Sequence, residues 1–273
     1  MPWWSERWEE ALFQHAATAS KLGVNYVQAS APSTTIELQA TSLDVGQDLA
    51  KHGIAGVVWN CARAMVSFLE AESQLAAHRH VLELGAGPGA VGLALASTGA
   101  VSSLLLTDLE SVVPLTCSNA NAAATQHETV AMLTASNRLD VRALCWGEPA
   151  DGVLADRHVD FVIASDCLYE SASHSAFLST LLEVTKPPKL GQQDENSRQH
   201  AVVLVAYKQR LPIKEKIFFE TAANYFNIAV YAADPSPSSS DDNCGNAVEY
   251  YDEAIYMCKL ERKDCDTVKV PPE

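Results

Sequence analysis

The chain has 273 residues, of which 48% are hydrophobic and 19% charged, which is typical of a globular protein and excludes a globally disordered one. Nineteen Lys and Arg against 34 Asp and Glu give a formal net charge of −15. This charge repels phosphate backbones and anionic lipid, so we expect neither nucleic acid nor a membrane as a partner.

Localisation and domain organisation follow from the same overview. The first residues, MPWWSERWEE, lack the basic and apolar segments of a signal peptide, and no run reaches about 18 apolar residues. We therefore expect a cytoplasmic protein. We expect one domain over residues 1–273, because a doubly wound α/β fold fills this length with a single core. Its seven cysteines are scattered and include no CxxC pair, which predicts reduced thiols and no metal site.

The first 50 residues form an N-terminal extension of mixed pattern. WSERWEEALFQ (4–14) has helical character, and the alternation in TTIELQAT (34–41) predicts a strand. A helix beginning at Trp59 follows, because apolar side chains recur at helical spacing at Val58, Ala62, Met65, Val66 and Leu69.

Apolar runs then alternate with helical stretches through the rest of the chain. The expected strands are HVLELG, SSLLLTD, VRALCW, DFVIAS, AVVLVAY, NIAVYA and EAIYMCKL, with helices around 89–98, 110–123, 173–185 and 212–224. This alternation predicts an α/β fold, a doubly wound and mainly parallel sheet of seven strands. We expect the last two strands to be antiparallel neighbours. Two polar segments, 186–200 and 233–246, are rich in Pro, Ser or charge and are predicted to be surface insertions.

The stretch VLELGAGPGAVGLALA (81–96) is the most informative motif. Gly85, Gly87 and Gly89 follow a strand directly, where missing Cβ atoms let the backbone turn sharply and approach a ligand. Gly92 lets the next helix pack closely on its strand. Such spacing is shared by dinucleotide oxidoreductases and by nucleoside-binding transferases, and some glycine-rich turns only turn the chain.

Two acidic residues help to decide whether the turn binds a dinucleotide or an adenosyl ligand. Glu83 puts a carboxylate beside the turn, which disfavours a pyrophosphate and suits the positively charged S-adenosylmethionine. Asp108, at the end of SSLLLTD, is placed to accept both ribose hydroxyls of an adenosine, although an Asp there also suits the cap of the next helix.

Four segments together resemble a known family. They are VVWNCARAMVSFLE, VLELGAGPGAVGLALA, TDLESVVPLTCSNANAA and DFVIASDCLYE, covering about residues 57–183, with a weaker echo in AVVLVAYKQR and YYDEAIYMCKL. The chain resembles the seven-stranded S-adenosylmethionine-dependent methyltransferases of class I, which have a Rossmann-like fold. Within them it is most similar to the methyltransferase family 16 group of protein-lysine methyltransferases, on the D-x-x-Y of residues 166–169 together with Trp59 and the CW of residues 145–146.

The resemblance implies a cofactor site, residue by residue. Asp108 is expected to bind the ribose, Trp146 to lie by the adenine, and Ser165 to line the cavity near the methyl donor. Members of the group often have alanine at the position of Ser165. The other residues implied to contact S-adenosylmethionine are Trp59, Gly85, Ala86 and Gly87, beside Glu83.

The D-x-x-Y element supplies the expected catalytic residues. Methyl transfer is an in-line displacement that needs no metal, and a lysine acceptor must arrive as a neutral amine. We expect Asp166 to orient that amine by hydrogen bonding and Tyr169 to line the channel through its ring. The structural alternatives are a helix cap for Asp166 and a core position for Tyr169. Nothing assigns Asp166 as a general base.

Other residues and functions are alternatives to this interpretation. His158 and His174 are expected to be polar surface or capping residues, and Cys167 has no base partner that would make it a nucleophile. The alternatives are methylation of a small molecule or another protein side chain, a nicotinamide oxidoreductase, and a non-catalytic binding module. The group resembled methylates chaperones and translation factors, so a lysine-bearing protein is the expected partner of a monomeric enzyme.

Overall fold

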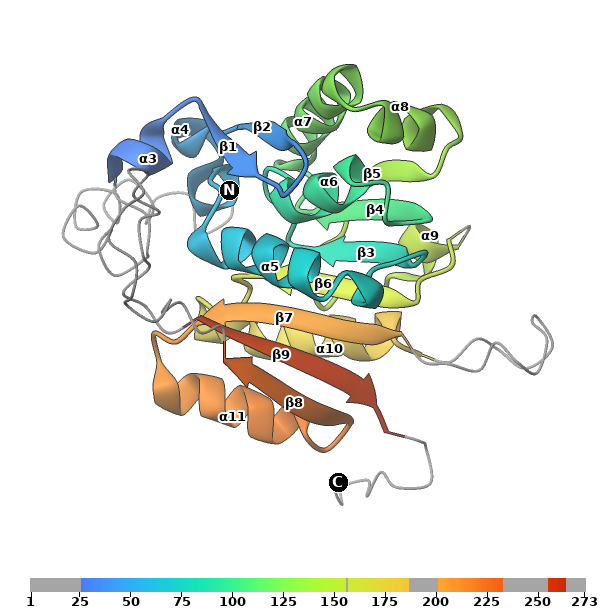
Figure 1. The fold of residues 1–273 in the computed structure, drawn as a ribbon. Coiled ribbons are helices and arrows are strands. Elements are labelled where there is room, and N and C mark those ends of the chain that lie inside the picture. Colours follow the sequence, from blue (N-terminus) through green and yellow to red (C-terminus); the bar gives the residue numbers. More distant parts are fainter. Residues whose placement is uncertain (1–25, 156, 187–200, 233–254, 264–273) are drawn as a thin grey trace, which may run out of the picture.

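The computed structural model describes residues 26–155, 157–186, 201–232 and 255–263, and a seven-stranded sheet forms their centre (Figure 1). Its strand order is β5-β4-β3-β6-β7-β9-β8, and β9 runs antiparallel to both of its neighbours. The strands are β3 (His80–Leu84), β4 (Ser103–Asp108), β5 (Leu139–Ala143), β6 (Phe161–Ser165), β7 (Val202–Lys208), β8 (Phe226–Ala232) and β9 (Ile255–Arg262). The predicted fold class is confirmed, including the antiparallel last strand.

Helices cover both faces of this sheet, and each face has its own apolar core. One face packs against α5 (Asn60–Ala71), α6 (Ala90–Ser97), α7 (Val113–Gln126) and α8 (Glu128–Ala135). The other packs against α9 (Asp151–Leu154), α10 (His174–Val184) and α11 (Pro212–Ala222). This burial on both sides explains why the parallel strands are continuous apolar runs in the sequence.

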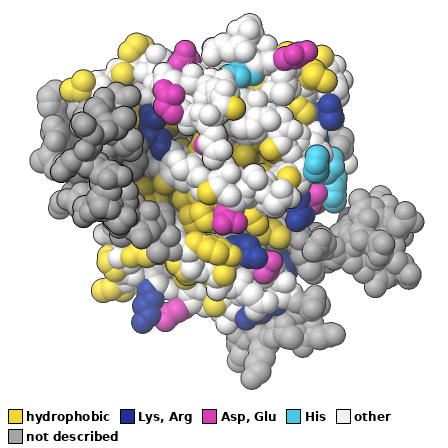
Figure 2. All heavy atoms as spheres, in the orientation of Figure 1, with side chains coloured by type: hydrophobic (Ala, Val, Ile, Leu, Met, Phe, Trp, Pro, Cys, Tyr) yellow, Lys and Arg dark blue, Asp and Glu magenta, His cyan; other side chains and the backbone are white. Residues whose placement is uncertain are grey.

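Helix α5 shows how the sequence pattern places an element. The apolar positions that predict it, Val58, Ala62, Met65, Val66 and Leu69, are all buried. Trp59 precedes the first helical residue as its N-cap. Figure 2 shows hydrophobic side chains gathered in the middle of the face on which α5 lies. Phe68 of α5 contacts Tyr231 of β8 at 5.6 Å between ring centroids.

The region before α5 contains more structure than the sequence predicts. Strand β1 (Ser33–Glu37), expected from TTIELQAT, pairs with an unexpected β2 (Ser42–Gly46), and Ile36, Leu43 and Val45 bury the hairpin against the α5 face. Short helices α3 (Tyr26–Ser30), α4 (Leu49–His52) and a 3₁₀ turn over Gly53–Gly56 complete this region.

One strand boundary differs from expectation, and one helix was not expected. Strand β5 covers Leu139–Ala143 instead of VRALCW, so Trp146 lies in the loop beyond the strand. Helix α8 was not predicted, because it is only eight residues long and its apolar residues do not mark one buried face: Val130 and Leu133 are buried, whereas Met132 is 58% exposed. The expected helix 4–14, the 233–246 insertion and all but Lys186 of the 186–200 insertion lie outside the described residues.

In the part of the chain that the structure describes, no single helix is long and apolar enough for a membrane span. The stretch Leu49–Gly56 with Asn60–Ala71, bent by 51°, meets the criterion only as a pair and only by length and composition.

Candidate active site

The candidate site lies where the parallel strands end. Strand order reverses between β3 and β6, since β4 and β5 follow on one side and β7 on the other. In an open α/β sheet this reversal leaves a crevice at the carboxyl ends of the strands. The glycine turn after β3, Asp108 at the end of β4, and Asp166 directly after β6 therefore belong to one edge of the sheet.

Left-handed backbone at three glycines, Gly85, Gly87 and Gly89, shapes the turn after β3. Gly85 has φ +63° and Gly87 has φ +53°, conformations that cost L-residues about 1–2 kcal/mol. A Cβ on Gly85 would lie 2.9 Å from the Trp146 ring, and one on Gly87 would lie 2.9 Å from the Ala55 carbonyl oxygen. Both positions therefore require glycine, for conformation and for space.

Three N–H groups of the turn donate within the protein. Ala86 donates to the Thr107 carbonyl at 2.9 Å, Gly87 to Oδ2 of Asp108 at 2.7 Å, and Gly89 to the Ala86 carbonyl at 2.7 Å. A pyrophosphate is normally held by such N–H groups at a helix N-terminus. Because these three are already used, the turn suits a ligand that brings no phosphate to them.

Asp108 is held entirely by backbone. Besides the bond from Gly87, its Oδ1 accepts from the Leu109 amide at 2.7 Å, and the side chain is 9% exposed. Burial raises the pKa of this carboxyl, and the two amide bonds oppose the rise. Each carboxylate oxygen keeps a second lone pair, so Asp108 can still accept hydroxyl groups from a ribose.

The Glu83 carboxyl was expected beside the ligand, but it bonds to the backbone of α6. It is 1% exposed, and its Oε2 accepts from the Gly92 amide at 2.8 Å inside the first turn of α6. Burial raises its pKa to about 8, so most of the group is protonated at pH 7. Glu83 therefore does not supply the negative charge that its position beside the turn predicted. The bond from the Gly87 amide to Asp108 is what disfavours a pyrophosphate ligand and favours S-adenosylmethionine.

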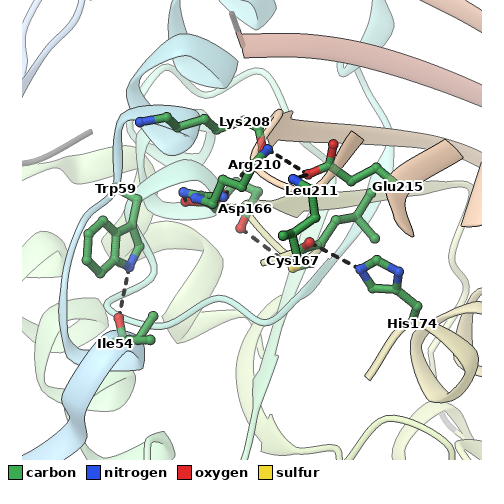
Figure 3. Close-up of polar contacts among 11 residues, drawn as sticks. Ile54, Trp59, Asp166, Cys167, His174, Lys208, Arg210, Leu211 and Glu215 are labelled. Atoms are coloured by element: carbon green, nitrogen blue, oxygen red, sulfur yellow. Dashed lines mark hydrogen bonds and ion pairs between the residues drawn. The ribbon is translucent and has the colours of Figure 1, made fainter. Parts of the chain in front are cut away.

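Asp166 is held by a side chain. Its Oδ1 and Oδ2 accept from Nη1 and Nη2 of Arg210 at 2.6 and 2.8 Å, a bidentate ion pair that Figure 3 shows. Its backbone has φ +57° and its amide donates to the Ala206 carbonyl at 2.8 Å. The carboxylate does not cap a helix. Glu170 accepts from the Ala172 amide at that position instead.

A small pocket lies against this ion pair and is lined by Ile54, Trp59, Asp166, Tyr169 and Arg210. The indole N–H of Trp59 donates to the Ile54 carbonyl at 2.9 Å, and this bond fixes the orientation of the ring (Figure 3). Tyr169 is 36% exposed, which argues against the alternative of a core position. Burial raises the pKa of its phenol to about 12, so it is neutral at physiological pH.

The remaining expected cofactor residues lie around the turn. Trp146 packs beside Gly85 and contacts Phe177 at 4.8 Å between ring centroids, at the edge of the apolar core. Ser165 is the last residue of β6, next to Asp166, and pairs with Ala206 of β7.

Two residues thought ordinary have defined structural roles. The Cys167 thiol donates to the Leu84 carbonyl at 3.4 Å, and burial raises its pKa well above the usual range, which disfavours a nucleophilic thiolate. His174 was expected at the surface or as a cap but is 8% exposed. Its Nε2 lies 3.1 Å from the Leu168 carbonyl, and its ring contacts Phe218, so it fixes the D-x-x-Y loop.

Sequence reasoning missed two important residues. Arg210 follows β7, and the rule that ligands bind at strand ends, applied to AVVLVAYKQR, would have placed a cation beside Asp166. Asn119 of α7 is 5% exposed and joins the β2 end to the glycine turn, through bonds with both backbone groups of Gly46 and with the Pro88 carbonyl. No local pattern in the sequence distinguishes it from the other asparagine of SNANAA.

Comparison with known proteins places this arrangement in a family. The model of the family described as "Lysine methyltransferase" matches residues 37–225. The protein N-lysine methyltransferase METTL21A of Xenopus tropicalis is 27% identical over 188 residues, which cover 69% of this chain and 76% of the relative. The protein-lysine N-methyltransferase EFM6 of Saccharomyces cerevisiae is 25% identical over 67% of this chain and 76% of its own length.

A solved structure agrees at the level of fold. A branched-chain polyamine synthase mutein from Thermus thermophilus, in complex with N4-aminopropylspermidine and 5′-methylthioadenosine, has a TM-score of 0.50 and 15% identity. The match covers 78% of this chain and 59% of that one. Since the family match spans most of the chain and includes both the glycine turn and the D-x-x-Y element, the chain belongs to the lysine methyltransferase family.

Proposed function

We propose that this protein transfers a methyl group from S-adenosylmethionine to a lysine side chain of a protein substrate. One observation carries the choice of donor. The N–H groups of Ala86, Gly87 and Gly89 are bound within the protein, and one of their acceptors is the Asp108 carboxylate. This arrangement favours an adenosyl donor without phosphates over a nicotinamide dinucleotide.

The residues present fit such a donor. Asp108 keeps lone pairs for ribose hydroxyls, and Trp146 lies beside Gly85, where an adenine ring can pack against an aromatic side chain. Asp166 and Tyr169 line a pocket at the same sheet edge, which is where an acceptor amine would have to arrive. We assign Trp59, Ala86 and Ser165 to the boundary of the same site.

S-adenosylmethionine supplies an activated methyl group on a sulfonium. The neutral lysine nitrogen forms the new N–C bond with its lone pair while the S–C bond breaks and its electrons remain on sulfur. The nitrogen is left as a methylammonium, which releases its proton to solvent. The protein's residues orient the amine and exclude water, with Asp166 accepting a hydrogen bond from it and Tyr169 closing the pocket.

The substrate class follows from the family and is supported by charge. Members of this family act on lysine, and a net charge of −15 attracts a lysine-rich protein surface.

The test is incubation of the purified protein with methyl-labelled S-adenosylmethionine and a cell lysate, followed by acid hydrolysis and mass spectrometry of the labelled protein. We expect label in methyllysine, and an equal amount of boiled protein serves as the control. Label only in small molecules, or only in another residue type, would contradict the proposal.

A further inference from the structure

The ion pair between Asp166 and Arg210 is built into the fold from two neighbouring strands. Asp166 follows β6 and Arg210 follows β7, and these strands pair in parallel up to Ser165 and Ala206. The side chains of the pair are 7% and 13% exposed, and both line the pocket. Arg210 therefore contributes to the surface that an acceptor amine would meet.

The arginine is also fixed from behind. Oε1 of Glu215 accepts from the backbone amides of Arg210 at 2.7 Å and Leu211 at 2.9 Å, at the start of α11 (Figure 3). Glu215 is 1% exposed. This buried contact fixes the backbone at Arg210, and both terminal nitrogens of the guanidinium donate to Asp166.

This pairing bears on a difficulty of lysine methylation. A lone buried carboxylate attracts an ammonium and stabilises it, whereas the reaction requires the neutral amine. A carboxylate already paired with a guanidinium has little net charge to offer, yet its unused lone pairs still accept a hydrogen bond. The pair can therefore orient an amine without trapping it as a cation.

We infer that Arg210 is a positioning residue that neutralises the Asp166 carboxylate, so that the pocket receives the acceptor amine in its neutral, nucleophilic form. This inference rests on the proposed function, since it assigns a residue to the same reaction.

Other titratable and charged groups surround the pair and must be considered in any pH dependence. Cys61 of α5 interacts with Asp166 and Arg210, and burial raises its pKa well above the usual range. Tyr169 interacts with Asp166, Asp108 and Glu170, and its raised pKa keeps it neutral. Cys167 also interacts with Asp166, and Glu215 contacts the backbone of Arg210. Lys208 contributes its backbone carbonyl, which lies 3.5 Å from Nη1 of Arg210. Below pH 9 no cysteine or tyrosine of this set is expected to gain charge.

The experiment measures methyllysine formed in a lysate from labelled donor, between pH 6.5 and 9.5, with wild type, Arg210→Met and Arg210→Lys. For Arg210→Met we expect roughly a 10-fold lower rate at pH 7.5 and a pH profile displaced upward by about one unit, because the exposed carboxylate retains the ammonium. Arg210→Lys restores the charge and should return the profile to its wild-type position.

Two further variants separate charge from packing. Arg210→Met combined with Asp166→Asn removes both charges, and we expect a low maximal rate with the wild-type profile position. Arg142→Met removes an arginine paired with Asp140 at 2.8 Å on β5 and should leave the profile unchanged. A purely structural role for Arg210 would lower the rate equally at every pH, and that result would overturn the inference.

Failure of the proposed function gives a different result, namely no methyllysine with wild type. In that case binding of n-butylamine to the protein loaded with S-adenosylhomocysteine, measured by calorimetry at pH 8 in buffers of different ionisation enthalpy, still tests Arg210. We expect one proton released per amine bound by wild type and none by Arg210→Met. Equal proton release by the two proteins would contradict the role given to Arg210.

Discussion

Asp108 ends β4 and Asp166 directly follows β6, the two strands that flank β3, so both lie at the same edge of the sheet. Both are less than 10% exposed, yet they are held in opposite ways. Asp108 accepts two backbone amides, from Gly87 and Leu109. Asp166 accepts two nitrogens of one side chain, Arg210. The first carboxylate depends on the path of the main chain alone, whereas the second depends on a residue 44 positions away.

This difference matches the two halves of a transfer reaction. The methyl donor binds in the same form in every cycle, and a carboxylate held rigidly by the backbone, Asp108, suits it. An acceptor amine that must arrive in one protonation state is served by a carboxylate whose charge is balanced by a neighbour. We therefore expect substitution of Asp108, on the donor side, to change donor affinity, and substitution of Asp166, on the acceptor side, to change the rate of methyl transfer.

The largest expected effect is on the Asp166 side. Asp166→Asn should lower methyl transfer roughly 100-fold or more, because it removes the group that orients the amine and leaves Arg210 without its carboxylate. Affinity for S-adenosylhomocysteine, measured by calorimetry, should stay near that of wild type. Asp140→Asn, which alters an aspartate paired with Arg142 and Arg157 on β5, is the control. Equal loss of transfer in the control would mean that general destabilisation is the cause.

Glu83 extends the comparison of Asp108 with Asp166, since it is a buried carboxyl that is bonded to neither a cation nor two backbone amides. Its pKa is raised from 4.5 to about 8 in the folded protein, so its contribution to stability is full below pH 4.5 and is lost as the pH rises towards 8. Glu83→Gln carries no such proton. The free energy of unfolding of the variant minus that of wild type should therefore rise by about 3 kcal/mol between pH 5.5 and 8.

Denaturant unfolding at several pH values measures this difference. Glu220→Gln, at a position exposed on α11, should show no such slope. A difference independent of pH for Glu83→Gln would show that the buried carboxyl is ionised throughout this range.

Asp108→Asn tests the donor side. The amide oxygen can keep only part of the bonding to Gly87 and Leu109 and gives a weaker acceptor for ribose hydroxyls, which corresponds to a loss of about 2 kcal/mol or roughly 30-fold in donor affinity. Calorimetry with S-adenosylhomocysteine measures the affinity. At saturating donor the transfer rate should remain within about 3-fold of wild type. A variant that binds normally but fails to transfer would reverse the two roles.

The smallest expected effect comes from the turn itself. Gly87→Ala places a methyl group 2.9 Å from the Ala55 oxygen on a backbone with φ +53°, which should lower the free energy of unfolding by about 1–2 kcal/mol. Gly152→Ala, where nothing lies within 4 Å of the added Cβ, should be neutral or slightly stabilising. Equal stability of the two variants in denaturant unfolding would remove the steric argument for glycine at this position.

Most of the fold follows from the sequence because the parallel strands are buried on both faces and therefore form continuous apolar runs. Helix α5 is predicted for a similar reason, since its buried side follows one helical period. Strand β2 and helix α8 were missed because their short apolar patterns are set by packing against distant elements.

The site could be predicted only in part. The glycine turn, Asp108 and Asp166 follow from their positions at strand ends, which local sequence reveals. Arg210 also follows a strand end, but its ion pair with Asp166 can be predicted only when this position is combined with the pairing of β6 with β7. The burial of Glu83 was also hidden, since a carboxyl before a glycine turn can face either the ligand or the following helix, and only the packing of α6 decides.

Calorimetric titration of the folded protein with S-adenosylhomocysteine and, separately, with NAD tests the central claim most directly, because three N–H groups of the glycine turn, those of Ala86, Gly87 and Gly89, are already bound to internal acceptors. We predict saturable binding of S-adenosylhomocysteine with one site per chain and no measurable binding of NAD. Absence of heat with S-adenosylhomocysteine, or tighter binding of NAD, would contradict the account.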